Sequence, residues 1–261
     1  MDLEGKVAIV TGASRGIGKG VAVALAKQGV HVVVAARSEQ QRRLPGTIVE
    51  TADEIKAMGL SALPVRCDVR DEESIEETVS KTMEALGRVD ILINNAAVGT
   101  YDPFLELPVK LWDLVIAVNL RGPFLFSRAV LPSMIDQGWG SIVNLSSLGA
   151  DQLTSTAFAT DPEAPPTIVG QAYGVSKSAL ERLSRGLAAE MGRHNIAVNA
   201  VKPSRPVLTE GFQFQRPDAD YSLWVTPESL VKAVVFLARQ DASGVTGAVT
   251  TDQELILAHG L

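Results

Sequence analysis

The sequence has little cysteine, histidine or aromatic content. It contains one cysteine, Cys67, and three histidines, His31, His194 and His259, which lie far apart along the chain. A single cysteine cannot form an internal disulfide bond or a cysteine-based metal site, and the histidines lack the spacing of metal ligands. Although carboxylates from distant segments could still meet in the fold, nothing in the sequence points to a metal, and we expect none.

An excess of positive charge is also missing. The chain has 24 Lys and Arg residues against 30 Asp and Glu residues, which gives a net charge of −6. There is therefore no diffuse positive field to hold nucleic acid, and the basic residues are scattered, with Arg42-Arg43 as the only adjacent pair. We expect no nucleic-acid partner. With 46% hydrophobic and 21% charged residues, the composition is typical of a folded domain.

Targeting segments and long apolar runs are not visible either. No basic segment followed by an apolar run occurs near Met1, and no stretch approaches the ~18 apolar residues that a membrane span needs. The sequence Ala258-His259-Gly260-Leu261 is not a recognised address for the endoplasmic reticulum or the peroxisome. We expect a soluble, cytoplasmic protein without a membrane partner.

Short β-branched runs alternate with helical patterns over the first two hundred residues. Apolar runs predict strands at 7–10, 31–35, 62–67, 90–93 and 141–145. Helical spacing follows the first strand and recurs at 48–58, at 71–86 and in a long segment that contains Trp112, Val115, Val118 and Leu125. Near-continuous apolar strands separated by helices indicate a parallel sheet covered on both faces. We therefore predict a doubly wound α/β fold.

A glycine-rich segment, residues 11–18, lies between the first predicted strand and the first predicted helix. Glycines permit a tight turn and a close approach of the backbone to a phosphate, and a helix start supplies unpaired N–H groups and a positive dipole end. The segment reads Thr11-Gly12-Ala13-Ser14-Arg15-Gly16-Ile17-Gly18. It favours a dinucleotide-binding loop, with a turn required only for packing as the alternative.

Two other motifs overlap this loop. Gly12-Ala13-Ser14-Arg15-Gly16 matches the nucleophile elbow of serine hydrolases, but only eleven residues precede Gly12, which leaves no room for the oxyanion-hole loop of that fold. The phosphate loop of nucleotide hydrolases would need glycine at position 13 and Ser or Thr at position 20. A hydrolase that acts through Ser14 is therefore the remote alternative.

Arg37 directly follows the second predicted strand. In NAD-binding loops an acidic residue at this place binds the adenosine ribose hydroxyls, and here the strand ends Ala35-Ala36-Arg37 without a carboxylate. Arg15 lies in the glycine loop that faces the same ribose. Two guanidinium groups and no acid favour a 2′-phosphate, so we predict NADP(H) rather than NAD(H). Either arginine alone could be a solvated surface residue.

Tyr173 and Lys177 are four residues apart at the start of a predicted helix. This spacing places the phenol and the ammonium on one helix face. A neighbouring cation favours phenolate and lowers the pKa of tyrosine from its ordinary value of ~10, which makes a proton donor and acceptor usable near neutral pH. The other tyrosines, Tyr101 and Tyr221, have no lysine four residues later. An ordinary exposed Tyr–Lys pair is the alternative.

With these motifs in order, the sequence resembles the short-chain dehydrogenase/reductase family from about residue 6 to about residue 250. The resemblance implies one Rossmann-type domain over 1–261, with cofactor binding in about 1–150, a seven-stranded parallel sheet and assembly as a homotetramer or homodimer. The motifs are Thr11 to Gly18, Cys67-Asp68-Val69, Asn94-Asn95-Ala96-Ala97, Asn119, Asn144-Leu145-Ser146-Ser147, Tyr173 with Lys177, and Val198-Asn199-Ala200-Val201-Lys202-Pro203.

The resemblance also implies roles for individual residues. Tyr173 is expected to be the general acid/base, and Lys177 to lower its pKa and bind the nicotinamide ribose. Ser147, rather than Ser146, is expected to bind the substrate oxygen, and Asn119 to hold a proton-relay water by distorting its helix. The expected cofactor contacts are Gly12, Ser14, Arg15, Gly16, Ile17, Gly18, Arg37, Asp68, Val69, Asn95, Ala96, Tyr173, Lys177 and Pro203.

The chain departs from the family pattern in four places, two of which suggest substrate loops at about 151–170 and 204–225. Four aromatic residues in the second loop favour a bulky apolar or aromatic substrate: Phe212, Phe214, Tyr221 and Trp224. The departures are a lengthened connection at 42–47, about a dozen extra residues between Ser147 and Tyr173, Pro203-Ser204-Arg205-Pro206 in place of proline-glycine, and Asp252-Gln253-Glu254 in place of aspartate-glycine-glycine.

These features together predict an oxidoreductase that transfers hydride between NADP(H) and a carbonyl or alcohol. In this scheme the cofactor carries the hydride, and the protein positions it and handles the proton. Ketone reduction or oxidation of a secondary alcohol is the leading hypothesis. Imine or enoyl reduction on the same scaffold, and a cofactor-binding regulatory protein that has lost catalysis, are the alternatives.

Overall fold

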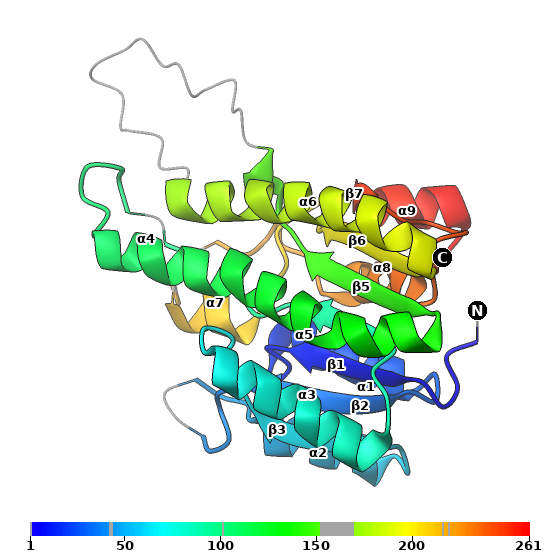
Figure 1. Ribbon diagram of the computed structural model, residues 1–261. Coiled ribbons are helices and arrows are strands. Elements are labelled where there is room, and N and C mark those ends of the chain that lie inside the picture. The colour runs from blue at the N-terminus through cyan, green and yellow to red at the C-terminus, as the bar shows by residue number, and fades with distance from the viewer. Residues whose placement is uncertain (1, 42–43, 101, 152–169, 216, 219) are drawn as a thin grey trace.

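The computed structural model describes residues 2–41, 44–100, 102–151, 170–215, 217–218 and 220–261 (Figure 1). Its strands form one seven-stranded parallel sheet in the order β3-β2-β1-β4-β5-β6-β7. The predicted doubly wound α/β fold is confirmed. The strands are β1 (Val7–Thr11), β2 (His31–Ala36), β3 (Ala62–Arg66), β4 (Ile91–Asn94), β5 (Gly140–Leu145), β6 (Ile196–Lys202) and β7 (Val249–Thr251).

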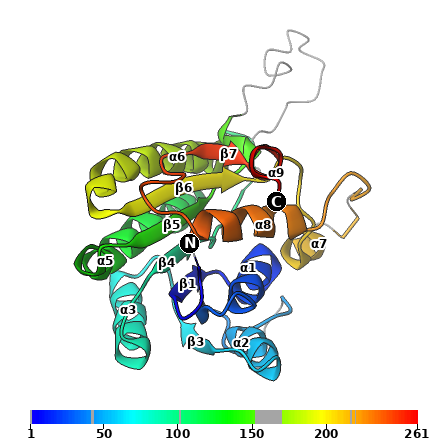
Figure 2. The same ribbon diagram turned by 90° about the vertical axis from the view of Figure 1, so that its right-hand side faces the viewer.

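Helices cover both faces of the sheet (Figure 2). One face carries α1, α2, α8 and α9, and the other carries α3, the α4–α5 helix and α6. The helices are α1 (Gly16–Ala26), α2 (Ile48–Ala57), α3 (Glu72–Leu86), α4 (Val109–Ile116), α5 (Gly122–Gln137), α6 (Gln171–Met191), α7 (Glu210–Gln215), α8 (Glu228–Ala238) and α9 (Asp252–His259).

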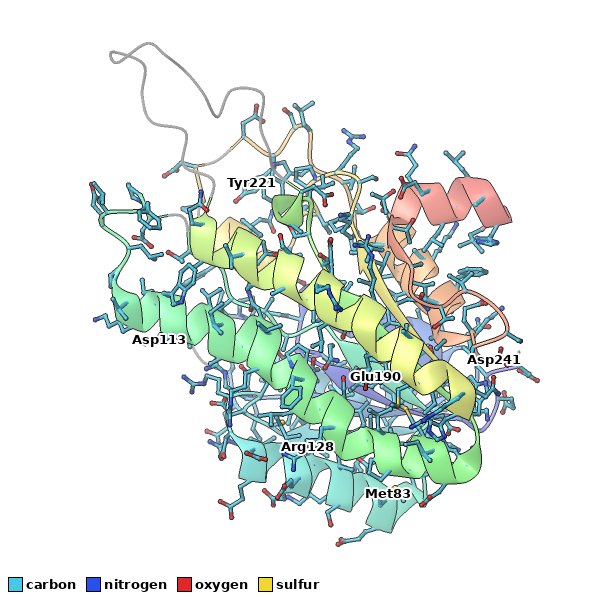
Figure 3. All side chains as sticks on the ribbon, turned by 45° about the horizontal axis from the view of Figure 1, so that its top comes forward. Met83, Asp113, Arg128, Glu190, Tyr221 and Asp241 are labelled. Carbon is cyan, nitrogen blue, oxygen red and sulfur yellow. The ribbon has the colours of Figure 1, made fainter. Side chains whose placement is uncertain are left out.

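The two cores lie on opposite faces because successive strand residues point to opposite sides. In β1, Ile9 packs with the α3–α5 side, whereas Ala8 and Val10 pack with the α1–α8 side. All the residues of β1 are buried, which explains why the strand reads as a continuous apolar run rather than an alternating one. On the outer helix surfaces, Asp113 and Arg128 are exposed to solvent (Figure 3).

The sheet order reverses at β1, which pairs with β2 on one side and β4 on the other. In open parallel sheets, ligands bind beyond the carboxyl ends of the strands at such a switch point. The glycine loop follows β1 at this point, and the segment that begins at Asn95 follows β4 beside it. The topology therefore places the candidate cofactor loop at the expected ligand crevice.

The helix from Val109 to Gln137 corrects one expectation from the sequence. It is 29 residues long with a window of mean hydropathy 1.5, so its length and composition would allow it to cross a membrane. A search for uninterrupted apolar runs misses it because Asn119 and Arg121 interrupt the run. Half of that window is buried inside the fold, and Phe126 is part of the core against the sheet. The helix thus behaves as a core helix of this domain.

Candidate active site

The glycine loop crosses the chain after β4 at close range. A Cβ atom on Gly12, whose φ is +66°, would lie 2.9 Å from the Cα of Ala96, and one on Gly18 would lie 2.5 Å from the carbonyl oxygen of Gly12. Asn95 holds the crossing together, because its Nδ2 donates to the carbonyl of Thr11 over 2.8 Å. These contacts require glycine at both positions. The hydrogen bond from Asn95 also holds the glycine loop against the segment that follows β4.

The loop leads into the amino-terminal turn of α1. Arg15 is the N-cap residue and makes no side-chain capping bond, so the first N–H groups of the helix are available to an anion. A helix N-terminus reached through a glycine turn is a phosphate-binding arrangement. Residues 16–18 therefore fit the pyrophosphate of a dinucleotide. Ser14 is only 4% exposed, whereas a nucleophilic elbow would present its serine to solvent.

A cavity of about 610 Å³ opens beside this loop at the ends of β2 and β3. Within it, Asp68 is paired with Arg70, whose hydrogen bonds hold the pKa of the Asp68 carboxyl below its usual range. That pairing neutralises one acid and leaves an excess of positive charge. The cavity is lined by Arg15, Arg37, Ser38, Leu44, Arg66, Asp68, Arg70, Asp71 and Ser74.

Arg15 joins the glycine loop to the lengthened connection after β2. Its Nε donates to the carbonyl of Pro45 over 2.6 Å, and its Nη2 donates to the carbonyl of Gly46 over 2.8 Å and to Ser38 Oγ over 3.3 Å. Burial lowers the pKa of Arg15, the negative charge of Glu210 acts against this, and the charge of Arg37 acts in the same direction as burial. The structure thus brings both arginines to one cavity, with Arg15 already engaged in holding its wall.

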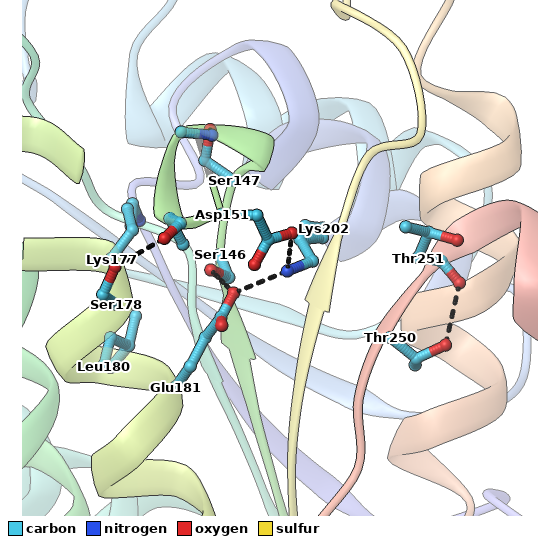
Figure 4. Close-up of polar contacts among 12 residues, drawn as sticks. Ser146, Ser147, Asp151, Lys177, Ser178, Leu180, Glu181, Lys202, Thr250 and Thr251 are labelled. Carbon is cyan, nitrogen blue, oxygen red and sulfur yellow. Dashed lines mark hydrogen bonds and ion pairs between the residues drawn. The ribbon is translucent and has the colours of Figure 1, made fainter. Parts of the chain in front are cut away.

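The end of β5 and the first turn of α6 bring Ser147 and Tyr173 together. A Cβ atom on Gly149 would lie 3.5 Å from Ser147 Oγ and 3.5 Å from Tyr173 Cδ1, so Gly149 occupies the gap between them. Ser147 Oγ also accepts a hydrogen bond from the N–H of Gly149 over 3.1 Å. Ser146 points elsewhere, because its Oγ donates to Glu181 over 2.6 Å (Figure 4). This geometry favours Ser147 as the serine that faces the reaction.

Lys177 is buried one helical turn after Tyr173. Its side chain lies with Nζ 5.7 Å from the centre of the Tyr173 ring, and Nζ donates to the carbonyl of Leu145 over 2.6 Å. Burial lowers the pKa of Lys177 to about 8, although the negative charge of Glu181 acts in the opposite direction. A lysine with this pKa still carries most of its positive charge at neutral pH, next to the ring of Tyr173.

Asn119 lies in a π-helical segment, Ala117–Arg121, which joins α4 to α5. Its Oδ1 accepts from the N–H of Val98, and its Nδ2 donates to the carbonyl of Val98 and to Ser176 Oγ, each over 2.9–3.0 Å. A π-bulge displaces backbone carbonyls from their ordinary partners and often marks a functional site. The helix distortion expected at Asn119 is therefore present, and its side chain ties the helix to α6.

The sequence matches the family described as short chain dehydrogenase over residues 6–220. The chain belongs to this family. The Bos taurus protein named hydroxysteroid dehydrogenase-like protein 2 is 40% identical over 79% of this chain, which spans about half of that protein's length (47%).

Two crystal structures are also similar to this chain. A short-chain type dehydrogenase/reductase from Mycobacterium marinum is 31% identical, with a TM-score of 0.79 and coverage of 96% of this chain and 94% of that one. A metagenomic short-chain oxidoreductase in complex with NADP is 31% identical, with a TM-score of 0.76 and coverage of 96% and 98%.

In this short-chain dehydrogenase, the departure after β6 is built into the fold. The N–H of Ser204 donates to Asp252 Oδ1 over 2.7 Å, and Thr251 with Glu254 forms a capping box that starts α9. The replacement of aspartate-glycine-glycine by Asp252-Gln253-Glu254 therefore creates a helix start, and Asp252 fixes the chain that follows Pro203. The contact therefore joins the aspartate that the family pattern keeps to the segment that departs from that pattern after Pro203.

The segment that contains α7 lies over the glycine loop. Thr209 Cγ2 would be 3.4 Å from a Cβ atom on Gly16. In the same segment, Trp224 makes edge-to-face contacts with Phe212 at 4.9 Å and with Tyr221 at 5.0 Å between ring centres. These three rings therefore hold the segment together, and Phe214 remains half exposed.

Three residues near the candidate cofactor site were not among the contacts predicted from the sequence. Ser38 and Arg66 line the arginine-rich cavity, and Thr209 covers Gly16. Arg66 could have been predicted as a cofactor contact, since it stands at the carboxyl end of the third predicted strand, where ligands bind in this fold. For Thr209 the altered sequence after Pro203 weakens the family pattern that would locate a cofactor contact, so it was not predicted.

Several predictions from the sequence remain untested. One of them is the predicted contact between Val69 and the cofactor. In the structure Val69 is buried and packs against Gly122. The paired arginines 42–43 and most of the predicted substrate loop, 152–169, lie outside the described residues. Among the residues that the structure does describe, no cluster of three His, Cys, Asp or Glu side chains could hold a metal ion.

Proposed function

We propose that this short-chain dehydrogenase is an NADP(H)-dependent ketone reductase or secondary alcohol dehydrogenase. The observation that carries the proposal is the buried Lys177 one turn after Tyr173, with its pKa lowered to about 8. A protein that only binds a cofactor has no need for a buried cation beside a phenol, because burial of a charge is costly unless it is used or paired.

The reaction needs a proton at the substrate oxygen. Tyr173 donates that proton during ketone reduction and accepts it during alcohol oxidation, while Lys177 favours the phenolate form by its positive charge. Ser147 donates a hydrogen bond to the same oxygen, where negative charge develops. The π-helical segment at Asn119 provides backbone carbonyls for the path by which Tyr173 regains its proton. NADP(H), when bound, supplies or accepts the hydride.

The preference for NADP(H) is supported by the charge of the cavity beside the glycine loop. Arg37 and Arg66 line it with Arg15, and a guanidinium binds phosphate oxygens in a bidentate manner. Because Arg15 already donates to the carbonyls of Pro45 and Gly46, we assign the main contact with a 2′-phosphate to Arg37. The similar metagenomic oxidoreductase was crystallised with NADP.

The substrate is proposed to be bulky and largely apolar. At the carboxyl end of the sheet, the segment between β4 and α4 exposes Phe104 by 70% and Leu105 by 96%, and the segment after α7 exposes Leu223 by 72%. Exposed apolar side chains gathered at one end of a fold favour contact with an apolar ligand. The name of the bovine relative, hydroxysteroid dehydrogenase-like protein 2, is consistent with a ring-shaped ketone.

We further propose a cytoplasmic homodimer or homotetramer. The outer surface of the α4–α5 helix carries exposed apolar side chains, with Val109 exposed by 74% and Phe124 by 48%, which supports self-association. Light scattering coupled to size-exclusion chromatography tests this proposal. A mass of one chain, 27.7 kDa, at micromolar concentration would contradict it.

The test of function is a screen for NADPH consumption across ketones, diketones, keto acids and cyclic imines, with steroid ketones included. We expect turnover of a bulky ketone, a loss in kcat on the order of 10²–10⁴-fold in Tyr173→Phe, and unchanged NADPH binding by fluorescence titration. Ser14→Ala tests the alternative of a serine hydrolase and should retain most of the turnover. Turnover that survives Tyr173→Phe, or that is confined to small charged substrates, would contradict the proposal.

A further inference from the structure

Lys202, the last residue of β6, is enclosed beside the catalytic groups. Its side chain is only 7% exposed, and its Nζ lies 3.1 Å from Glu181 Oε1 and 2.5 Å from Asp151 Oδ2 (Figure 4). A charged lysine buried to this degree needs ionic partners, and here it has two. Asp151 ends the Ser147 turn, which we define as residues 146–151.

The partners of Lys202 hold the Ser147 turn on both sides of its serine. Before Ser147, the hydroxyl of Ser146 donates to Glu181 on α6 over 2.6 Å. After it, Ser178 Oγ, also on α6, donates to the carbonyl of Ala150 over 2.7 Å. Together with the ion pair at the end of the turn, these bonds fasten the turn to the helix that carries Tyr173. The distance between the serine and the tyrosine therefore depends on this cluster.

The same cluster sets the charge beside Lys177. Among the described titratable groups, Tyr173 and Glu181 on its own helix act on that ammonium directly. Lys202 on β6 is paired with Glu181, and Asp151 on the turn is paired with Lys202. Of these, Glu181 lies one turn further along α6, and its charge raises the pKa of Lys177 against the effect of burial.

Lys202 keeps its charge over the range in which Lys177 titrates. Burial lowers the pKa of Lys202, but its bonds to Asp151 and Glu181 outweigh that effect, so the pKa is raised overall. Lys202 therefore stays protonated near pH 8 and offsets the negative charge of Glu181.

We propose that Lys202 is a positioning residue: by bridging Glu181 and Asp151 it holds Ser147 against Tyr173 and balances the negative charge beside Lys177. The inference rests on the proposed function, since it concerns how the groups of that reaction are placed. It involves a residue that touches neither the expected substrate oxygen nor the cofactor loop.

Two substitutions with opposite electrostatic signs test this proposal. Lys202→Met removes a positive charge and should raise the pH at which activity falls on the alkaline side. Glu181→Gln removes a negative charge and should lower it. The signs hold whether that limb reports Lys177 or Tyr173, because a lost positive charge raises both pKa values. Lys202→Met should also lower kcat on the order of 10- to 100-fold, as expected for a displaced reacting group, with the dissociation constant for NADPH unchanged.

Two controls accompany these variants. Lys202→Arg keeps the charge and should keep the wild-type pH profile. Lys6→Met removes a lysine that directly precedes β1 and pairs with the buried carboxylate of Asp90, and it should leave kcat and the pH profile unchanged. If Lys202→Met fails to fold, Asp151→Asn at a half-exposed position still removes the negative charge from this end of the bridge and should lower kcat several-fold. Shifts of the same sign in Lys202→Met and Glu181→Gln, or an unchanged kcat in both Lys202→Met and Asp151→Asn, would overturn the proposal.

A readout without substrate separates this inference from the proposed function. The free energy of unfolding should rise between pH 7.5 and 9.5 as the buried ammonium of Lys177 loses its proton. This rise should be larger in Glu181→Gln and smaller in Lys202→Met than in the wild type. If no carbonyl is reduced with NADPH, the proposed function fails. If the free energy of unfolding rises equally with pH in the three proteins, the charge balance assigned to Lys202 is overturned.

Discussion

The ammonium of Lys177 donates a hydrogen bond to the main-chain carbonyl of Leu145 over 2.6 Å. This bond joins the first turns of α6 to the last residue of β5. Because Ser147 stands two residues after Leu145, the bond fixes the cation relative to the serine as well as to Tyr173, which shares its helix. The three groups of the proposed reaction thus belong to one rigid junction between a strand and a helix.

The two serines after β5 should respond differently to alanine. Ser147→Ala removes a hydrogen bond to the reacting oxygen and is expected to lower kcat by on the order of 10²–10³-fold. Ser146→Ala removes a bond to Glu181 and should lower the free energy of unfolding by about 1 kcal/mol with a smaller effect on kcat. Steady-state kinetics and urea unfolding of both variants check this. A larger loss of kcat in Ser146→Ala would reverse the assignment.

Arg37 should determine the choice between NADPH and NADH. Hydrogen bonds to a charged group contribute about 1.5–3 kcal/mol, so Arg37→Asp is expected to weaken NADPH binding on the order of 10- to 100-fold and to favour NADH. Fluorescence titration with both cofactors measures the change. Arg128→Asp, on the exposed surface of α5, is the matched control. Equal NADPH affinity in the wild type and Arg37→Asp would exclude Arg37 from the site.

The effect of the close crossing at Gly12 can be measured separately from the effect of its positive φ value. Gly12 and Gly59 both have positive φ values, +66° and +77°, but only Gly12 has a neighbour, Ala96, within reach of a Cβ atom. Gly59→Ala should therefore cost only the left-handed conformation, about 1–2 kcal/mol. Gly12→Ala should cost more and abolish cofactor binding. Urea unfolding and NADPH titration compare the two, and equal effects on binding would contradict a special role for the crossing.

The stability of the folded protein should depend on pH through Lys177. Its pKa in the folded protein is about 8, below the ordinary 10.5, so the unfolded chain binds more protons between these values. Stability therefore rises with pH in this window, and below pH 8 burial of the ammonium costs on the order of 3 kcal/mol. Lys177→Met should remove this dependence, whereas Lys110→Met, at an exposed position, should keep it. Urea unfolding at pH 7.5 and 10 measures the free energy of unfolding of each protein. The same change with pH in the wild type and in Lys177→Met would contradict the prediction.

The sequence by itself determined the fold class, the family and the local chemistry. The strands of a doubly wound sheet are buried on both faces, so their apolar runs are visible without a structure. The glycine loop and the pair of Tyr173 and Lys177 are also local, because a turn and a spacing of four helical residues depend on the chain alone. The departures that follow Pro203 and Asp252 were visible as sequence changes, but the contact between Ser204 and Asp252 was not.

Only the tertiary structure decided which groups face one another. The orientation of Ser146 toward Glu181 and of Ser147 toward Gly149 depends on how β5 meets α6, and adjacent residues cannot be distinguished by pattern. The bonds of Arg15 join segments 30 residues apart, and the ion pair between Lys202 and Asp151 joins positions 51 residues apart. Such contacts arise because parallel strands bring distant carboxyl ends to one edge, where loops of unrelated sequence meet. The depressed pKa of Lys177 belongs to the same class, since it follows from burial that no spacing of residues records.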